Sequence, residues 1–274
     1  MSRAIGVAVP TTDNSFFGAL AEYLDRGLRE RGLSAVVVSC GNDVQRERDG
    51  LAALVGLGVK GLVCVSGLSE LPGGLVPDDL PLVWVDRVPR AARAVPWVAN
   101  DDAEAMERAV TLLIQKGCRD VLLMPGYLPE GQESPRVVGY RRALEAKGII
   151  LDPSRILRRQ SLGSSEAETA SLVRAWVESG RPLDGIVTSS DRAAFGATCA
   201  LRTLGRYVPE DVRLVSFDNS PYAAMADPPI TALDRKPALL ARRACEVLLA
   251  QIEGHPYDVA NVIPVDLIER TSTR

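Results

Sequence analysis

Histidine and aromatic side chains are scarce in this 274-residue sequence. It holds one histidine, three tryptophans, six tyrosines and four phenylalanines. The histidine, His255, lies in the turn-like segment Gly254-His255-Pro256, far along the chain from any candidate serine. A hydrolase needs an activating base beside its nucleophile, so this composition argues against a histidine-dependent one.

Several motifs of catalysis are also missing. The sequence has no G-x-x-x-x-G-K-[ST] phosphate loop, no G-x-S-x-G nucleophile turn and no clustered carboxylates typical of a divalent-metal site. A glycosidase that uses two carboxylates is left open, although nothing positive supports it. We expect a protein that is not an enzyme and holds no cofactor or metal.

Cysteines are few and scattered, with no C-x-x-C pair. Their odd number and wide spacing favour neither a zinc site nor a disulfide framework, and reduced cytosol is the simpler interpretation. Residues 1–6 pass directly into a strand-like run, and no apolar stretch approaches the length of a membrane span. We expect a cytoplasmic protein with no membrane partner. The cysteines are Cys40, Cys64, Cys118, Cys199 and Cys245.

Charge is balanced. The net charge of −3 and the pI of about 5.4 leave no basic footprint for a phosphate backbone. Any contact with nucleic acid would therefore have to come from a part that these residues do not include.

Short, unbroken apolar runs alternate with longer helical patterns along the chain. Strands that are apolar on both faces belong to parallel sheets covered by helices on each side, so the sequence predicts a doubly wound α/β fold. The number of strands exceeds one compact sheet, which indicates two lobes that divide near residues 98–101. The expected strands are 5–10, 35–40, 61–65, 82–86, 121–125, 186–188 and 214–218.

The expected helices have readable ends. Asn14 or Ser15 can cap the first, Asp101 or Asp102 the next, and Ser134-Pro135 begins a third. Glycines 32, 117 and 148 follow these helices and would end them. Further helices are expected from Ser165, over 190–205 and over 237–254.

Five segments resemble, in order and spacing, the regulatory core of the LacI/GalR family of transcription regulators. The ordered set spans nearly the whole chain, and the segment 208–218 with its continuation to Thr231 is the most specific member. Exported solute-binding proteins share the fold, but that segment is more similar to the regulators. The five segments are 5–17, Val83-Trp84-Val85-Asp86-Arg87, Asn100-Asp101-Asp102, Arg136-x-x-Gly139-Tyr140-Arg141-x-Ala143-Leu144, and 208–231.

The resemblance implies two lobes of the periplasmic-binding-protein type I fold, joined by short crossovers, with a ligand cleft between them. The N-terminal lobe would comprise 1–100 with 234–263, and the C-terminal lobe 101–233 with 264–274. The family also implies a small-molecule effector, a homodimer, and operator DNA bound through a helix-turn-helix headpiece that precedes the core. Residue 1 already lies at the first core strand, and the sequence does not say whether a headpiece was removed or never present.

Three candidate ligand residues are two from the first lobe, Phe16 and Asp86, and Leu162. Phe17 fits the apolar face of its helix, whereas Phe16 lies off that stripe and is expected to face the cleft. Asp86 occupies a strand end, where an ion pair across the cleft would explain it equally well. Leu162 stands where many relatives place a stacking aromatic ring, and leucine offers a smaller surface for that contact.

Three further candidates belong to the second lobe. Arg136 lies in the first turn of a helix, where the helix dipole disfavours a cation. Its guanidinium group can hold two oxygen atoms of a ligand. Asp191 can serve as a cap or accept ligand hydroxyls, and Asp218 is either a turn aspartate or a ligand residue. Because the three would converge on hydroxyls, the resemblance and these residues favour a neutral sugar as effector.

Two other functions compete with an effector-sensing regulator core. A transport-linked solute-binding protein would have no DNA role and would normally be exported. A cytosolic α/β enzyme would need catalytic residues that the sequence does not reveal.

Overall fold

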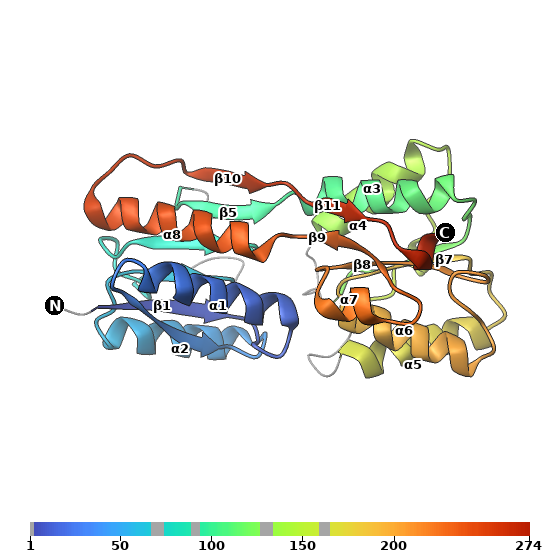
Figure 1. The fold of residues 1–274 in the computed structure, drawn as a ribbon, viewed down its shortest axis with the longest axis horizontal. Helices are drawn as coiled ribbons and strands as arrows, with labels where there is room; N and C mark the ends of the chain where they lie inside the picture. The colour runs from blue at the N-terminus through green and yellow to red at the C-terminus, as the bar shows by residue number, and fades with distance from the viewer. Residues whose placement is uncertain (1–2, 67–73, 89–93, 127–133, 159–164) are drawn as a thin grey trace. The chain divides into compact units, whose positions relative to one another are not determined.

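The computed structural model describes residues 3–66, 74–88, 94–126, 134–158 and 165–274. The chain divides into two compact units, shown as a ribbon in Figure 1. Unit 1 comprises Met1–Asn100 and Lys236–Pro264, and unit 2 comprises Asp101–Arg235 and Val265–Arg274. The first boundary agrees with the one expected from the sequence. The sequence placed the second after residue 233, two residues before the observed one, and the third after residue 263, one residue before the observed one.

Unit 1 is built on a parallel sheet with the strand order β10-β5-β4-β3-β1-β2. Its strands are β1 (Ala4–Val9), β2 (Ser34–Ser39), β3 (Leu62–Cys64), β4 (Leu82–Val85), β5 (Trp97–Asn100) and β10 (Ala260–Ile263). Its helices are α1 (Ser15–Arg29), α2 (Val44–Gly56) and α8 (Pro237–Glu253).

Alternating side chains of these strands enter two separate cores. Ile5, Val7 and Val9 of β1 pack with α1 and α8, which lie side by side in Figure 1. Ala8 points to the opposite face and packs with Leu51 of α2 and its neighbours. Burial on both faces explains why the strands appear in the sequence as unbroken apolar runs.

Unit 2 is built on a sheet with the order β11-β9-β8-β7-β6. Its four larger strands run parallel, and β11 pairs antiparallel with β9 at the edge. The strands are β6 (Val121–Met124), β7 (Gly185–Thr188), β8 (Arg213–Phe217), β9 (Thr231–Asp234) and β11 (Asp266–Ile268). The helices are α3 (Asp102–Gln115), α4 (Pro135–Glu145), α5 (Ser165–Glu178), α6 (Asp191–Thr203) and α7 (Pro221–Met225), with the 3-10 turns η2 (Pro153–Arg155) and η3 (Thr271–Thr273).

The sheet of unit 2 is also covered on both faces. One core joins α3 and α4 to side chains such as Leu123, Val215 and Phe217. The other joins α5 and α6 to the alternate side chains, including Leu122 and Leu214. Figure 1 shows the two helix pairs on opposite sides of the sheet.

The doubly wound α/β class predicted from the sequence is confirmed, with one difference in detail. An all-parallel sheet was expected, whereas β11 is antiparallel, as edge strands on parallel sheets often are. The N-terminal ends of three helices have the capping residues that the sequence predicted. Asn14, Asp101 and Ser134 cap α1, α3 and α4 by accepting backbone N–H donors.

None of the helices in the described residues is both long and apolar enough to cross a membrane. Within the same residues, no group of three or more His, Cys, Asp or Glu side chains is arranged to hold a metal ion.

Gly139 allows α3 and α4 to approach closely. A Cβ atom built on Gly139 would lie 2.1 Å from the carbonyl oxygen of Ala103 and 2.9 Å from Cβ of Met106. Backbone atoms cannot move aside as a flexible side chain can, so any larger residue must push the two helices apart. This contact explains why glycine stands at position 139 of the Arg136-x-x-Gly139 segment.

We expect Gly139→Ala to lower the free energy of unfolding by about 1–3 kcal/mol, the usual range for overpacking. Urea denaturation followed by circular dichroism measures this change. Gly56→Ala is the matched control, because Gly56 is also helical and a Cβ there meets nothing within 4 Å. It should be neutral or mildly stabilising. Equal midpoints for the two variants would contradict the packing argument.

Candidate functional site

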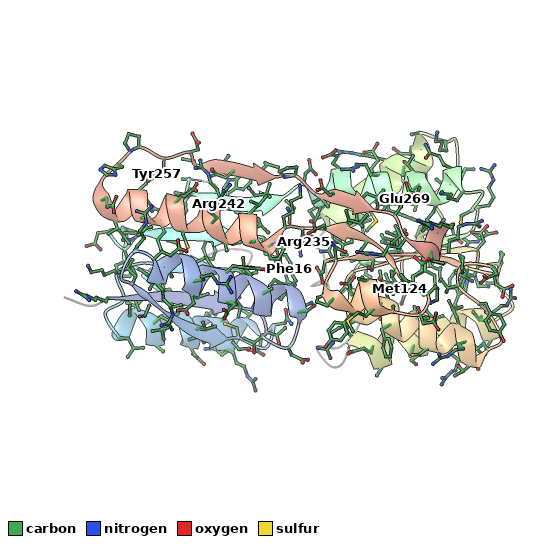
Figure 2. The ribbon with its side chains drawn as sticks, viewed as in Figure 1. Phe16, Met124, Arg235, Arg242, Tyr257 and Glu269 are labelled. Carbon is green, nitrogen blue, oxygen red and sulfur yellow. The ribbon has the colours of Figure 1, made fainter. Side chains whose placement is uncertain are left out.

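The carboxyl ends of the parallel strands of unit 2 lie at one edge of its sheet. Ligands of open parallel sheets bind at such edges, so the polar residues that follow these strands define the candidate site. Asp191 follows β7, Asp218 follows β8 and Arg235 follows β9. Figure 2 labels Arg235 and, at the end of β6, Met124.

Arg136 is held rigidly in the first turn of α4. Its Nε donates to Oδ2 of Asp102 over 3.0 Å, and its Nη1 donates to the carbonyl oxygen of Ser189 over 3.1 Å. Its guanidinium carbon lies 4.1 Å from the ring centroid of Phe217, within cation–π range. These contacts offset the cost of a cation near a helix N-terminus.

Asp102 and Arg235 complete a charged cluster around Arg136. Oδ1 of Asp102 lies 3.8 Å from Nε of Arg235, and Nη1 of Arg235 lies 3.6 Å from Oδ1 of Asp218. The side chain of Arg235 is 3% exposed, and burial lowers its pKa to about 9. The sequence showed Asp102 as a helix-capping candidate and as part of one family-like segment, and it did not single out Arg235.

Asp218 combines deep burial with an unusual backbone. Its φ is 99°, and the next residue, Asn219, has a φ of 55°. Such backbone outliers in non-glycine residues concentrate at functional sites. Burial raises the pKa of Asp218 well above its usual range, and the nearby Asp191 carboxylate raises it further, although Arg136 opposes both effects. A carboxyl group in this setting can be protonated and then donate as well as accept.

Asp191 is buried, and both of its carboxylate oxygens already have donors. The hydroxyl of Ser216 donates to Oδ1, and the backbone N–H and hydroxyl of Ser220 donate to Oδ2. Burial raises the pKa of Asp191, and these hydrogen bonds partly offset the rise. The arrangement ties α6 to β8 and to the start of α7. A direct ligand contact for Asp191 stays a prediction.

The candidates of unit 1 lie at the start of α1 and after β4. Phe16 and Phe17 are 2% and 5% exposed, and their rings meet edge to face with centroids 5.2 Å apart. Both belong to the α1–α8 core, so the expectation that Phe16 lies off the apolar face of α1 was wrong. A ligand contact for Phe16 is not tested and stays a prediction. Figure 2 labels Phe16 on α1. Asp86 is half-buried with a φ of 65°, another backbone outlier at a strand end.

Leu162 lies outside the described residues, so its expected contact is a prediction from the sequence alone. Three contributors to the site were missed by sequence reasoning, namely Asp102 as an arginine partner, Arg235, and Phe217 as a stacking surface. The position of Arg235 directly after an apolar strand is the signal that could have found it.

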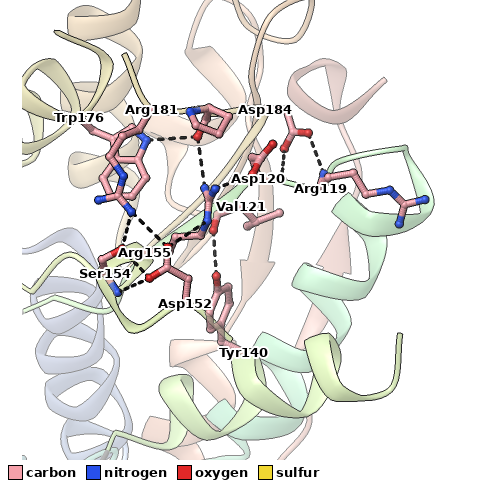
Figure 3. Close-up of polar contacts among 11 residues, drawn as sticks. Arg119, Asp120, Val121, Tyr140, Asp152, Ser154, Arg155, Trp176, Arg181 and Asp184 are labelled. Atoms are coloured by element: carbon pink, nitrogen blue, oxygen red, sulfur yellow. Dashed lines mark hydrogen bonds and ion pairs between the residues drawn. The ribbon is translucent and has the colours of Figure 1, made fainter. Parts of the chain in front are cut away.

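The opposite edge of the unit 2 sheet carries a different polar network, shown in Figure 3. Arg155 binds Asp120, and Arg181 stacks 3.6 Å from the ring centroid of Trp176 while it pairs with Asp152. Both carboxylate oxygens of Asp184 accept backbone N–H donors from residues 119 and 120. A pocket of about 320 Å³ adjoins this network. Because these groups satisfy one another, we interpret the network as a closure of the amino edge.

Comparison with known proteins agrees with the fold. Residues 110–273 match the family described as periplasmic binding protein-like domain. The HTH-type transcriptional regulator MalR of Streptomyces coelicolor is 30% identical over 279 residues, which cover 98% of this chain and 80% of that protein.

Two solved structures share the fold over nearly the whole of this chain. The transcriptional regulator CelR in complex with cellobiose superposes with a TM-score of 0.86 at 24% identity and covers 99% of this chain and 84% of CelR. A periplasmic binding protein/LacI transcriptional regulator from Alkaliphilus metalliredigens, complexed with D-xylulofuranose, gives a TM-score of 0.84 at 24% identity with complete coverage of both chains.

The fold and the match to the family model therefore define a periplasmic-binding-protein-like domain. The chain belongs to the LacI family of transcriptional regulators, whose members it matches over nearly its whole length.

We expect ionisation of Asp218 to weaken the folded state as pH rises. Because its pKa is raised on folding, the folded state holds this proton more tightly than the unfolded state. The stabilisation is present below the ordinary pKa of 3.8 and is lost as pH rises through the folded pKa. Asp218→Asn, which tolerates positive φ, should therefore reduce the fall in urea midpoint with increasing pH.

Urea midpoints measured from about pH 4 to pH 8 provide the check, since this range lies above the ordinary Asp pKa. Asp25→Asn is the control: the hydrogen bond from Arg29 lowers the pKa of Asp25, so its titration lies below this range. An Asp218→Asn profile parallel to the wild-type profile would show that Asp218 stays ionised throughout.

Proposed function

We propose that this chain is the effector-sensing part of a LacI-family repressor and that it binds a neutral polyhydroxylated small molecule, a sugar, at the carboxyl edge of the unit 2 sheet. The observation that carries the proposal is the fixed Arg136 guanidinium, stacked on Phe217 beside the buried Asp218. Donor and acceptor groups held in place before binding lose little entropy when a ligand arrives.

The donors of Arg136 are divided between the protein and the proposed ligand. A guanidinium has five N–H donors, and the described hydrogen bonds of Arg136 use Nε and one N–H of Nη1. The side chain is 14% exposed, and we propose that Nη2, for which no hydrogen bond is described, binds oxygen atoms of the ligand. The rigid fork suits a pair of neighbouring hydroxyl oxygens.

Asp218 complements this donor. A carboxyl group with a raised pKa can accept a hydrogen bond from one hydroxyl and donate to another, which suits a polyol better than a ligand with a single type of group. The two sugar-complexed proteins that share the fold support the same ligand class. Contacts from Phe16, Asp86, Asp191 and Leu162 remain part of the proposal as predictions from the sequence.

The proposed regulation follows from linkage. An effector can change the affinity for operator DNA only to the extent that it binds the DNA-competent and DNA-incompetent states differently. DNA contact would be made by a headpiece of the kind that this family places before its core, since the net charge of −3 gives these 274 residues no basic footprint.

Sugar binding should raise the melting temperature of this chain, and Arg136→Ala should weaken that binding at least about tenfold, or about 1.4 kcal/mol. A thermal-shift screen of sugars, sugar phosphates, nucleobases and amino acids identifies the ligand, and calorimetry gives the affinities. Arg142→Ala, an exposed arginine later in α4, is the control and should bind normally. A stabilising sugar that Arg136→Ala binds as tightly as wild type would place the site elsewhere.

We further propose that two copies associate through the α6–α7 patch, defined as Phe195, Tyr222 and Met225. These side chains are 57%, 64% and 83% exposed and lie on two helices that contact one another. Large apolar side chains exposed on adjoining helices favour an interface. A second copy is the expected occupant because operator half-sites mirror a two-fold axis.

Met225→Asp and Phe195→Asp should convert the dimer to a monomer, because each would place a carboxylate in an apolar contact. Sedimentation velocity over a range of protein concentrations measures the change. Ile150→Asp is the matched control, since Ile150 is 91% exposed and lies outside the patch. A wild-type monomer, or a dimer that survives both patch substitutions, would contradict this part of the proposal.

A further inference from the structure

The carboxylate of Asp102 is divided between two arginines of unit 2. One oxygen lies 3.0 Å from Nε of Arg136, and the other lies 3.8 Å from Nε of Arg235. The Asp102 side chain is 18% exposed, compared with 14% for Arg136 and 3% for Arg235. Water therefore screens these charges only partly, and each one affects what can bind beside them.

The charges at this edge come close to balance. Arg136 and Arg235 contribute two positive groups, and the carboxylate of Asp102 lies beside both. Asp191 adds a second acid whose oxygens already accept protein donors, and the buried Asp218 adds negative charge only when it is ionised. A carboxylate or phosphate that approaches Arg136 would meet a guanidinium that Asp102 already neutralises. It would also be repelled by the acids.

We propose that Asp102 is a specificity-determining residue, an inference that rests on the proposed function. By neutralising Arg136 and Arg235, Asp102 restricts the site to neutral polyhydroxylated ligands and excludes their anionic counterparts. Arg136 keeps its hydrogen-bond donors for hydroxyl oxygens. It does not act as an unpaired cation for an acid.

A purely structural role for Asp102 can be separated from this one. An acid in the first turn of a helix stabilises the helix dipole, and Asp102 is the first residue of α3. The cap of that helix, however, is Asp101, whose Oδ1 accepts the backbone N–H of Glu104 over 2.9 Å. Asp102 is therefore not needed as the cap, and its carboxylate contacts the two arginines.

Asp101 also supplies the matched control. Asp102→Asn and Asp101→Asn each remove one negative charge from neighbouring positions, and asparagine remains a good cap at 101. Only Asp102→Asn leaves Arg136 and Arg235 without their shared carboxylate. The probes are pairs with one skeleton and different charge, such as D-glucose with D-gluconate, cellobiose with cellobionate, and D-ribose with D-ribose 5-phosphate.

Titration calorimetry gives the affinity of each variant for both members of every pair. Wild type and Asp101→Asn should bind one neutral member at least tenfold more tightly than its anionic partner. In Asp102→Asn the ratio should shift toward the anion by at least tenfold. Arg235→Gln should move the ratio the opposite way, and the double variant Asp102→Asn/Arg235→Gln should return it toward wild type.

Several results would overturn the inference. If Asp102→Asn and Asp101→Asn shift the ratio equally, or if Asp102→Asn weakens both members alike, Asp102 has no role in discriminating charge, although the sugar site stands. A wild-type chain that prefers an anionic member overturns both this inference and the neutral-ligand class. Should Asp102→Asn fail to fold, the Arg235→Gln shift and the wild-type ratio decide the question.

Discussion

The candidate site depends on the burial of charge at the carboxyl edge of unit 2. Taking a guanidinium or a carboxylate out of water costs several kcal/mol per ion, and only well-placed partners recover that cost. Arg235 is 3% exposed, so its charge could not persist there without the carboxyl groups of Asp102 and Asp218 beside it. Removing one member of such a cluster leaves an uncompensated charge that costs about 3–5 kcal/mol.

This constraint fixes four chain segments at once. Asp102 begins α3, Arg136 lies in the first turn of α4, Asp218 follows β8 and Arg235 follows β9. A further contact, from Arg136 to the carbonyl oxygen of Ser189, adds a fifth segment, directly after β7. The sheet brings these ends to one edge, and the charge cluster then sets their spacing. A ligand at this edge would meet groups whose positions are determined before it arrives.

The fold class could be predicted from the sequence because its signals are local. Apolar runs such as 121–125 report burial on both faces, and Asn14, Asp101 and Ser134 announce helix starts within a few residues. Helix α2 was not anticipated, because its buried side chains alternate with many charged ones. The antiparallel pairing of β11 depends on β9, over thirty residues earlier in the chain.

The site could be predicted only in part. Arg136 and Asp218 were identified because a motif and a strand end pointed to them. The partnership of Asp102 with Arg235 joins residues more than a hundred positions apart, so no local pattern contains it. Likewise, the sequence could not show that Ser216 and Ser220 occupy both oxygens of Asp191.

The segment after β8 connects the proposed ligand site to the proposed dimer surface. Asp218 and Asn219 both have positive φ, and Ser220 follows as the residue before α7, which carries Tyr222 and Met225. Asp191 binds Ser220 through its backbone and side chain, so α7 cannot move independently of α6. A ligand that alters the hydrogen bonding or ionisation of Asp218 would act on a backbone already held in a sparsely populated conformation. Such a segment favours discrete rearrangement over gradual deformation, which is the property that a switch between two association geometries requires.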